Sequence, residues 1–166
     1  MNKNIAVFGC GWLGLPLAKS LIKEGFNING STTSKEKIPL LEKSGISPFL
    51  VDLNSNNYAD GLKNLLKNAN ILIVNIPPRM KIGDTSSYFK KMEVLHHCIK
   101  QSSVSKVIFV SSTSVYGNFN GEVTEQTVPE PVSKGAKQLL ATERLFLNDS
   151  VLQSSIIRFG GLIGDD

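Results

Sequence analysis

Residues 5–14 read Ile-Ala-Val-Phe-Gly-Cys-Gly-Trp-Leu-Gly, an apolar run that leads into three glycines spaced as G-x-G-x-x-G. The run Ile5 to Phe8 predicts a buried strand, and apolar residues at helical spacing predict a helix behind the glycines. This strand, turn and helix form the context that a dinucleotide-binding fingerprint requires. Gly9 would allow the tight turn, Gly11 would let a pyrophosphate approach bare backbone, and Gly14 would let the helix pack against the strand. We therefore expect the anion at the N-terminus of this helix, where peptide N–H groups are unpaired.

The rest of the chain alternates short apolar runs with helix-like segments, which is typical of a parallel sheet with helices on both faces. Further strands are predicted over 26–30, 48–51, 71–76, 106–110 and 154–158, and further helices over 34–43, 58–67, 85–102 and 133–148. The inward face of the helix over 85–102 is predicted to hold Phe89, Met92, His96 and Ile99. The polar connection 111–132 is long for a compact domain, so a functional or mobile role is expected. The predicted fold class is α/β, a doubly wound parallel sheet.

Length and composition favour one globular domain over residues 1–166, because 41% of the 166 residues are hydrophobic. The net charge is +4, but the basic residues form no run that could follow nucleic-acid phosphates, so no nucleic-acid partner is expected. Two cysteines, Cys10 and Cys98, are too few for a disulfide framework and favour a reducing compartment. The N-terminal apolar stretch is broken by glycines and Pro16, and no run reaches the length of a membrane span. A cytoplasmic protein without membrane contact is expected.

The residues after the second predicted strand bear on the choice of cofactor. An acid there would accept a hydrogen bond from the ribose 2′-OH of NAD, whereas hydroxyls or a cation suit the 2′-phosphate of NADP. No acid occurs before Glu36, so the hydroxyls and Lys35 favour NADP over NAD; the alternative is that the hydroxyls, Ser34 among them, only cap the next helix. The residues expected to contact the cofactor are Gly9, Gly11, Trp12, Leu13, Gly14, Thr32, Thr33, Ser34, Lys35, Asp52, Leu53, Asn75, Ile76 and Pro77.

Several stretches make the sequence resemble the extended or atypical branch of the short-chain dehydrogenase/reductase superfamily, the NAD(P)-dependent epimerase/dehydratase group. Besides the glycine fingerprint they are Asp52-Leu53, Ser111-Ser112-Thr113-Ser114-Val115-Tyr116-Gly117, Pro131, Glu143, and Arg158-Phe159-Gly160-Gly161-Leu162-Ile163-Gly164. The resemblance implies an NAD(P)-dependent oxidoreductase or epimerase that acts on a nucleotide-sugar-like or other small hydroxylated substrate. It implies that Ser112 polarises the substrate oxygen, and it permits a homodimer. It also implies a smaller C-terminal substrate domain, which is largely missing from these residues.

The sequence departs from the family pattern where the acid/base tyrosine and its lysine are expected. A register set by Glu143 and Pro131 places Gly135 and Leu139 at those two positions, whereas a register set by Lys137 places Ser133 at the tyrosine position. Neither register supplies a tyrosine, so the usual proton donor is absent. The alternative function is therefore a non-catalytic dinucleotide-binding module or redox sensor.

Other residues carry weaker hypotheses. Tyr116 is interpreted as a structural loop residue rather than a substitute acid. Glu143 shares an apolar helix face, and a partly buried carboxylate needs a partner. The family resemblance implies that Glu143 is a structural rather than a catalytic residue. Arg79 follows the run 71–76 on the ligand side of the sheet and is a candidate contact for a phosphate or an acidic substrate. The adjacent His96 and His97 point in different directions on a helix, so no metal site is expected.

Overall fold

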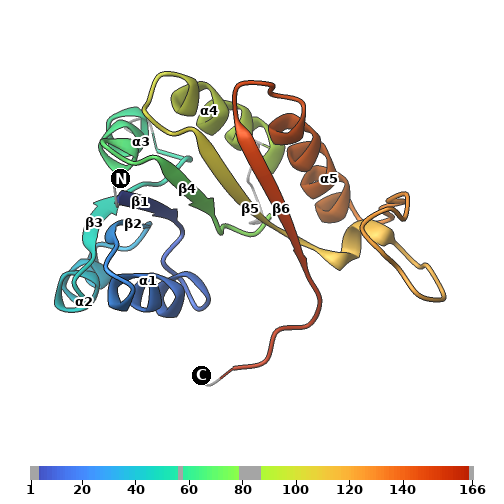
Figure 1. Ribbon diagram of the computed structural model, residues 1–166, viewed down its shortest axis with the longest axis horizontal. Coiled ribbons are helices and arrows are strands. Elements are labelled where there is room, and N and C mark those ends of the chain that lie inside the picture. Colours follow the sequence, from blue (N-terminus) through green and yellow to red (C-terminus); the bar gives the residue numbers. More distant parts are fainter. Residues whose placement is uncertain (1–3, 56–57, 79–86, 165–166) are drawn as a thin grey trace.

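The computed structural model describes residues 4–55, 58–78 and 87–164, and these contain a six-stranded parallel sheet in the order β3-β2-β1-β4-β5-β6 (Figure 1). The order reverses direction between β1 and β4, which confirms the doubly wound fold and opens a crevice at the carboxyl ends of these two strands. The strands are β1 (Asn4–Phe8), β2 (Asn27–Thr32), β3 (Ser47–Leu50), β4 (Ile71–Val74), β5 (Lys106–Ser112) and β6 (Gln153–Phe159).

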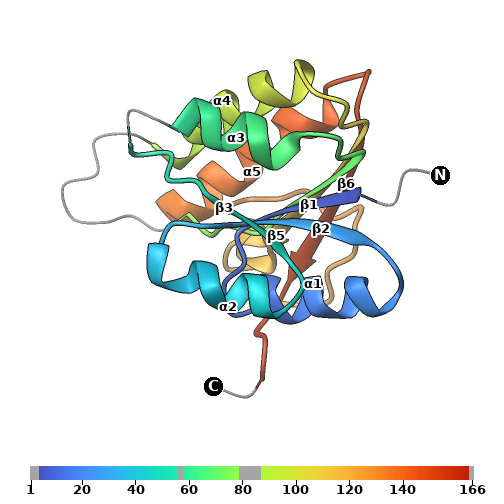
Figure 2. The same cartoon turned by 90° about the vertical axis from the view of Figure 1, so that its left-hand side faces the viewer.

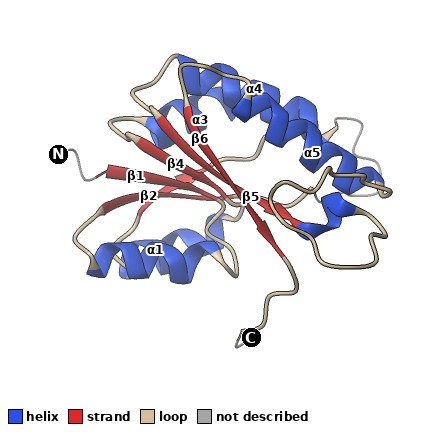
Figure 3. Ribbon diagram, turned by 45° about the vertical axis from the view of Figure 1, so that its right-hand side comes forward, coloured by secondary structure: helices blue, strands red, loops and turns tan. Residues whose placement is uncertain are grey.

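Helices cover the two faces of the sheet unequally (Figures 2 and 3). One face carries α1 (Gly14–Lys23) and α2 (Ile38–Lys43), and the other carries α3 (Tyr58–Leu66), α4 (Tyr88–Lys100) and α5 (Lys134–Leu147). The larger apolar core lies beneath α3, α4 and α5, and a smaller one lies beneath α1 and α2. Among the described residues, no helix covers β6 on the α1 side, and Ile157 of this strand is 41% exposed.

Two short 3-10 turns complete the described elements: η1 (Lys35–Lys37) and η2 (Thr113–Tyr116). The helix predicted over 34–43 is thus a 3-10 turn followed by α2, with Pro39 in the first turn of α2, where its missing N–H costs nothing. The predicted strand 71–76 ends at Val74, ahead of two prolines that cannot donate to a ladder. Strand β5 runs two residues beyond its predicted end, to Ser112, because β6 pairs with it along this length.

The buried face of α4 differs from the predicted one. It consists of Tyr88, Met92, Leu95 and Ile99, so the prediction was right for Met92 and Ile99 and wrong for Phe89 and His96. Helix α5 packs beside α4, and it draws Phe89 and His96 toward that flank rather than toward the sheet: the Phe89 N–H donates to the Gln138 side chain at 3.2 Å. Residues 85 and 86 of the predicted helix lie outside the described residues. None of the helices in the described part combines the length and apolar character that a bilayer crossing requires.

Candidate functional site

The turn between β1 and α1 needs glycine at two of the three positions of the G-x-G-x-x-G motif, because a side chain there would collide with the backbone. Gly9 has φ +109°, and a Cβ there would lie 2.5 Å from the Asn75 carbonyl oxygen. A Cβ on Gly14 would collide with the Gly9 carbonyl oxygen, so the helix can pack this close only with glycine. Both glycines therefore shape the turn.

Gly11 is different, because nothing in the described residues requires it to be glycine. Its φ lies outside the left-handed region, and a Cβ built on it would meet no described atom within 4 Å. The space beside Gly11 is therefore open, and Gly11 lies just before the start of α1. Helix α1 has no side-chain cap and no acidic residue in its first turn. Its first N–H groups are therefore left without a side-chain acceptor, as an anion-binding helix terminus requires.

Hydrogen bonds tie this turn to the strands on either side. The Gly9 N–H donates to Ser31 Oγ at 2.9 Å, and the Cys10 N–H donates to the Ser31 carbonyl at 2.8 Å, which fixes the turn to the end of β2. The Asn75 side-chain amide donates to the Gly9 carbonyl at 3.3 Å, which fixes it to the end of β4. The turn is therefore held in place before any ligand arrives.

Cys10 has a packing role inside the turn. It is 4% exposed, and its sulfur lies where a Cβ on Gly30 would stand, so each of the two residues limits the size of the other. Burial raises the pKa of the Cys10 thiol to about 11, although a backbone hydrogen bond from Ser31 acts in the opposite direction. The thiol is therefore protonated at neutral pH, which does not fit a reactive cysteine.

A cleft of about 320 Å³ opens beside the turn at the carboxyl ends of the strands, within the size range of small-ligand sites. The sequence-predicted site residues in its lining are Gly11, Trp12, Leu13, Asn75, Ile76, Pro77 and Ser112. The rest of the lining is Pro78, Val110, Ser111, Leu139, Phe159, Gly160 and Leu162. The fold thus brings together residues from the ends of β1, β4, β5 and β6. Among these described lining residues, no side chain titrates.

The residues predicted to choose between NADP and NAD lie at the end of β2, outside this lining. The predicted capping role of Ser34 is wrong: Ser34 stands at the N-cap of η1, but its hydroxyl oxygen accepts no capping hydrogen bond. The hydroxyl donates to the Glu36 carboxylate at 2.5 Å. That hydrogen bond is the main cause that lowers the pKa of the Glu36 carboxyl. Thr32 accepts from the Ser34 N–H at 3.1 Å, whereas Thr33 and Lys35 are exposed.

Asp52 and Leu53, which follow β3, also lie outside the cleft lining. The Asp52 carboxylate accepts from the backbone N–H and the side-chain amide of Asn54, each at 2.9 Å, and so closes a local turn. The Leu53 side chain packs against the larger core. Contacts within the chain therefore account for Asp52 and Leu53 without a ligand.

Ser112 ends β5 and lines the cleft. Its Oγ accepts from the Ser114 N–H at 3.1 Å, which caps η2. Because the oxygen accepts this bond, the hydroxyl proton points elsewhere and can be donated to a ligand oxygen in the cleft. The geometry is compatible with the substrate-polarising role that the family resemblance implies.

The two registers proposed for the missing tyrosine and lysine differ in what they place at the cleft. Leu139 lines it, and a Cβ on Gly135 would lie 3.7 Å from Pro78, so the first register faces the cleft. In the second register Ser133 caps α5 by accepting from the Ala136 N–H at 3.1 Å, and Lys137 is exposed. An apolar side chain therefore stands where the first register places the family lysine.

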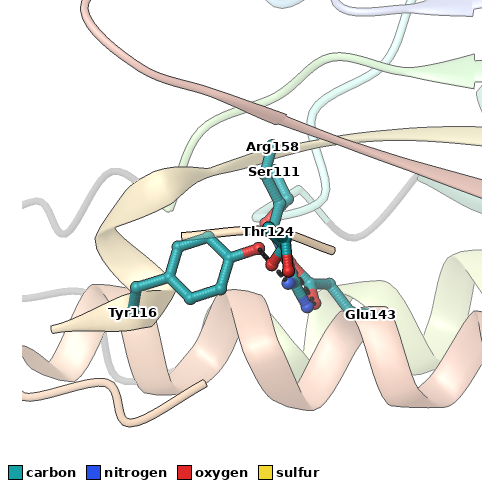
Figure 4. A network of polar contacts seen from close by, with 5 residues as sticks. All are labelled: Ser111, Tyr116, Thr124, Glu143 and Arg158. Atoms are coloured by element: carbon teal, nitrogen blue, oxygen red, sulfur yellow. Dashed lines mark hydrogen bonds and ion pairs between the residues drawn. The ribbon is translucent and has the colours of Figure 1, made fainter. Parts of the chain in front are cut away.

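Tyr116 does not offer a free proton to the cleft (Figure 4). Its hydroxyl donates to the Thr124 carbonyl at 3.0 Å and accepts from Arg158 at 2.8 Å, which supports the structural interpretation. Arg158 also pairs with Glu143, which is 1% exposed. Sequence reasoning predicted that Glu143 would be buried and need a partner, but it did not identify Arg158.

The remaining sequence hypotheses concern residues away from the cleft. His96 lies at the edge of the core and contacts Asp149, with 2.8 Å between His96 Nε2 and the carboxylate, and His97 is exposed. Within the described residues, no group of three or more potential metal ligands gathers. Arg79 lies outside the described residues.

Comparisons with known proteins agree on the class of protein. A family model described as NAD(P)H-binding matches residues 9–166. Protein YeeZ of Escherichia coli (strain K12) is 31% identical over 163 residues, which make up 98% of this chain and 60% of YeeZ. The chain therefore spans about 60% of the length of this curated relative.

Two solved structures share the fold. A putative NAD-dependent epimerase/dehydratase from Methylobacillus flagellatus is 26% identical, with a TM-score of 0.79 over 99% of this chain and 56% of that one. MoeE5, solved in complex with UDP-glucose and NAD, is 26% identical, with a TM-score of 0.72 over 92% of this chain and 52% of that one. The resemblance to the epimerase/dehydratase group is thereby confirmed, and the chain belongs to the NAD(P)H-binding family with the Rossmann-type fold of the short-chain dehydrogenase/reductase superfamily.

Proposed function

We propose that the cleft binds the nicotinamide dinucleotide with its diphosphate over Gly11, and that the protein is an NAD(P)-dependent oxidoreductase or epimerase. The observation that carries the proposal is the open space at Gly11, a glycine for which the fold itself gives no reason. A diphosphate in contact with the backbone supplies that reason. The uncapped N-terminus of α1 supports the same placement.

Different residues of the chain would then hold the cofactor and orient the substrate. The turn at Gly9, Gly11 and Gly14, with Trp12 and Leu13, holds the diphosphate, and the wall from Asn75 to Pro77 borders the nicotinamide ribose. The bound cofactor supplies hydride transfer. Ser112 would donate a hydrogen bond from its hydroxyl group to a substrate oxygen and so orient that oxygen. Because no described side chain that lines the cleft titrates, Ser112 positions the oxygen without replacing the missing acid.

The substrate in this proposal is a nucleotide sugar or another small hydroxylated molecule. The support comes from MoeE5, which shares the fold and was solved with UDP-glucose and NAD. The largely apolar wall of the cleft includes the polar residues Asn75, Ser111 and Ser112; the Ser111 hydroxyl donates to Glu143, so Asn75 and Ser112 are the side chains that suit one oriented hydroxyl or carbonyl group. Dimerisation and a separate substrate lobe belong to the same proposal.

The proposed cofactor preference is NADP over NAD, on the strength of Lys35. This exposed cation and the Thr33 hydroxyl stand beyond the end of β2, where a 2′-phosphate would lie. Glu36 opposes the preference, because Ser34 holds its carboxylate at the same strand end and its lowered pKa keeps it charged. Lys35 would therefore attract the 2′-phosphate, whereas Glu36 would repel it. Asp52 and Leu53 would border the adenine from the end of β3.

A non-catalytic dinucleotide-binding module is the second candidate. Leu139 in the lining favours it, because an apolar side chain there cannot hold the ribose hydroxyls as the family lysine does. The occupied hydroxyl of Tyr116 favours it as well.

Calorimetric titration of NADPH and NADH into the purified protein, followed by turnover assays with UDP-sugars and small ketones, tests both candidates. Binding with cofactor turnover supports the enzyme, and Ser112→Ala should then lower kcat more than it weakens cofactor binding. Tight cofactor binding with no turnover on any substrate leaves the binding module. Absence of binding at millimolar nucleotide by folded protein contradicts both.

A further inference from the structure

We propose that the ion pair between the buried Glu143 and the partly exposed Arg158 is a positioning device for the cleft. It aligns Ser112 on one wall and the segment after β6 on another, and so sets how tightly the nucleotide is held. Neither charged side chain lines the cleft itself. The inference rests on the proposed nucleotide binding and adds residues that the sequence motifs do not assign to the site.

The pair forms the centre of a closed polar network (Figure 4). Arg158 Nε donates to both Glu143 oxygens at 3.1 and 3.2 Å, and its Nη2 donates to Oε2 at 2.6 Å. The Ser111 hydroxyl donates to Glu143 Oε1 at 2.5 Å. The carboxylate of Glu143 therefore holds β5 through Ser111 and β6 through Arg158 at the same time, from its place on α5.

Ser111 lines the cleft itself, and both Ser111 and Arg158 precede a further residue of the cleft wall. Ser111 and Arg158 are opposite each other in the β5–β6 ladder, and the following pair is Ser112 with Phe159, both of which line the cleft. Neighbouring residues of a strand point to opposite faces. The ion pair thus links the two strands on the side that faces α5. Ser112 and Phe159 project from the other side, and their positions relative to α5 are fixed by this link.

A second arm of the network reaches the connection after β5. Arg158 Nη1 donates to the Tyr116 hydroxyl at 2.8 Å, and the guanidinium carbon lies 4.9 Å from the centre of the tyrosine ring. The same hydroxyl donates to the Thr124 carbonyl at 3.0 Å. Tyr116 ends η2, the turn that Ser112 caps. Arg158 therefore constrains the backbone on both sides of Ser112.

The segment after Arg158 connects the ion pair to the turn between β1 and α1, where we propose that the diphosphate binds. Gly160 and Leu162 line the cleft, and a Cβ on Gly164 would lie 2.7 Å from the Trp12 ring. The segment thus runs from the ion pair to the side chain that stands beside Gly11. Trp12 is the single tryptophan of the chain and is 51% exposed, so its emission reports the position of this segment.

Stability alone gives a weak reason for such a pair. The desolvation of the buried Glu143 carboxylate and the partly buried Arg158 guanidinium offsets much of their attraction, and an apolar replacement of similar volume is often as stable. What an apolar pair could not provide is the bidentate geometry and the shared hydroxyl contact, which specify one arrangement of three elements. Those elements meet at the edge of the cleft.

The experiment compares Glu143→Gln and Ser111→Ala with the control Thr142→Ala. Thr142 is fully buried on the same helix, and within the described part of the chain its hydroxyl bonds only to the Gln138 carbonyl of that helix, at 2.9 Å. Titration of NADPH should show a dissociation constant raised about tenfold in Glu143→Gln and about threefold in Ser111→Ala. Without nucleotide, Trp12 emission should move to longer wavelength in Glu143→Gln. The control should lower Tm while both readouts stay at the wild-type values.

Several outcomes would overturn the proposal. One is wild-type NADPH affinity and unshifted Trp12 emission in a folded Glu143→Gln protein; another is an equal loss of affinity in Thr142→Ala. If Glu143→Gln does not fold, the Trp12 emission of Ser111→Ala without nucleotide decides, because this variant keeps the ion pair, whereas Ser111 itself lines the cleft and its loss changes nucleotide affinity directly. Emission at the wild-type wavelength then overturns the proposal. If wild-type protein binds no nucleotide, the proposed function fails by itself, and the Trp12 emission of the variants still supports or overturns the coupling.

Discussion

The Asn75 side-chain amide donates a hydrogen bond to the carbonyl oxygen of Gly9 at 3.3 Å, across the place where the strand order reverses. A Cβ on Gly14 would also approach this amide, to 2.9 Å. One side chain at the end of β4 therefore holds the turn that follows β1 against the start of α1. Asn75 acts as a structural part of the turn as well as a wall of the cleft.

Asn75→Ala should loosen this turn. We expect a loss of about 1 kcal/mol in the free energy of unfolding, which is typical of one lost hydrogen bond, and a nucleotide dissociation constant raised about fivefold. Chemical denaturation and calorimetric titration measure the two effects. Asn29→Ala serves as the control, because its amide donates to the Leu65 carbonyl, away from the cleft. Equal nucleotide affinity in both variants would refute the role of Asn75.

The competition between Lys35 and Glu36 predicts opposite effects of their removal. Lys35→Ala should weaken NADP about tenfold and leave NAD nearly unchanged, because only the 2′-phosphate needs the cation. Glu36→Gln should strengthen NADP, since a charged carboxylate no longer faces the phosphate. Lys37→Ala, in the same exposed turn, is the control. Equal losses of NADP and NAD in Lys35→Ala would remove the basis for the NADP preference.

Cys10 should be inert in the native protein. With a pKa of about 11 and 4% exposure, its thiolate is scarce at pH 8 and hidden from reagents. In the Cys98→Ser variant, which leaves Cys10 as the single thiol, a disulfide reagent should react only after denaturation. Rapid modification of the folded variant, or loss of its nucleotide binding under mild oxidation, would instead favour the redox-sensor alternative.

The contacts of Asp149 predict an acid dependence of stability. A hydrogen bond from the Val151 N–H is the main cause that lowers the pKa of Asp149 from its ordinary value of 3.8, and His96 and Lys100 contribute. A carboxyl with a lowered native pKa stabilises the fold fully above the unfolded pKa, and this contribution is lost as pH falls through the native pKa. The difference in unfolding free energy between wild type and Asp149→Asn should therefore be constant above pH ~5 and shrink below pH ~4. A difference that stays constant down to pH ~2 would contradict the assignment.

The fold was predictable because its signals are local. The strand, turn and helix at residues 5–14 and the apolar run 71–76 follow from periodicity and glycine placement, and the structure confirms both, apart from a strand end two residues earlier. The buried face of α4 was not predictable, because the packing of α5 beside it decides which residues face the sheet. Phe89 and His96 each follow a buried residue, Tyr88 and Leu95, and were predicted in their place.

The candidate site was predictable only for residues whose role follows from their own type and their neighbours in the sequence. The roles of Gly9 and Gly14 follow from the turn, and the burial of Glu143 follows from its apolar helix face. The partner of Glu143 did not follow, because the pairing with Arg158 depends on the register between β5 and β6. The bond between Ser34 and Glu36 was missed because a short polar side chain has several nearby acceptors, and the sequence does not rank them.

The most direct test of the account is a titration of NADPH followed by the emission of Trp12, with Gly11→Asp measured beside wild type. The bound nicotinamide would lie close to this tryptophan, so wild-type emission should be quenched and sensitised nicotinamide emission should appear. Gly11→Asp should remain folded by circular dichroism, because a side chain at Gly11 meets no described atom within 4 Å, but it should bind at least a hundredfold more weakly, since its carboxylate occupies the diphosphate position. Ser20→Asp, which adds the same charge farther along α1, should bind like wild type. Unchanged affinity in folded Gly11→Asp, or no response of wild type at millimolar NADPH, would contradict the central claim.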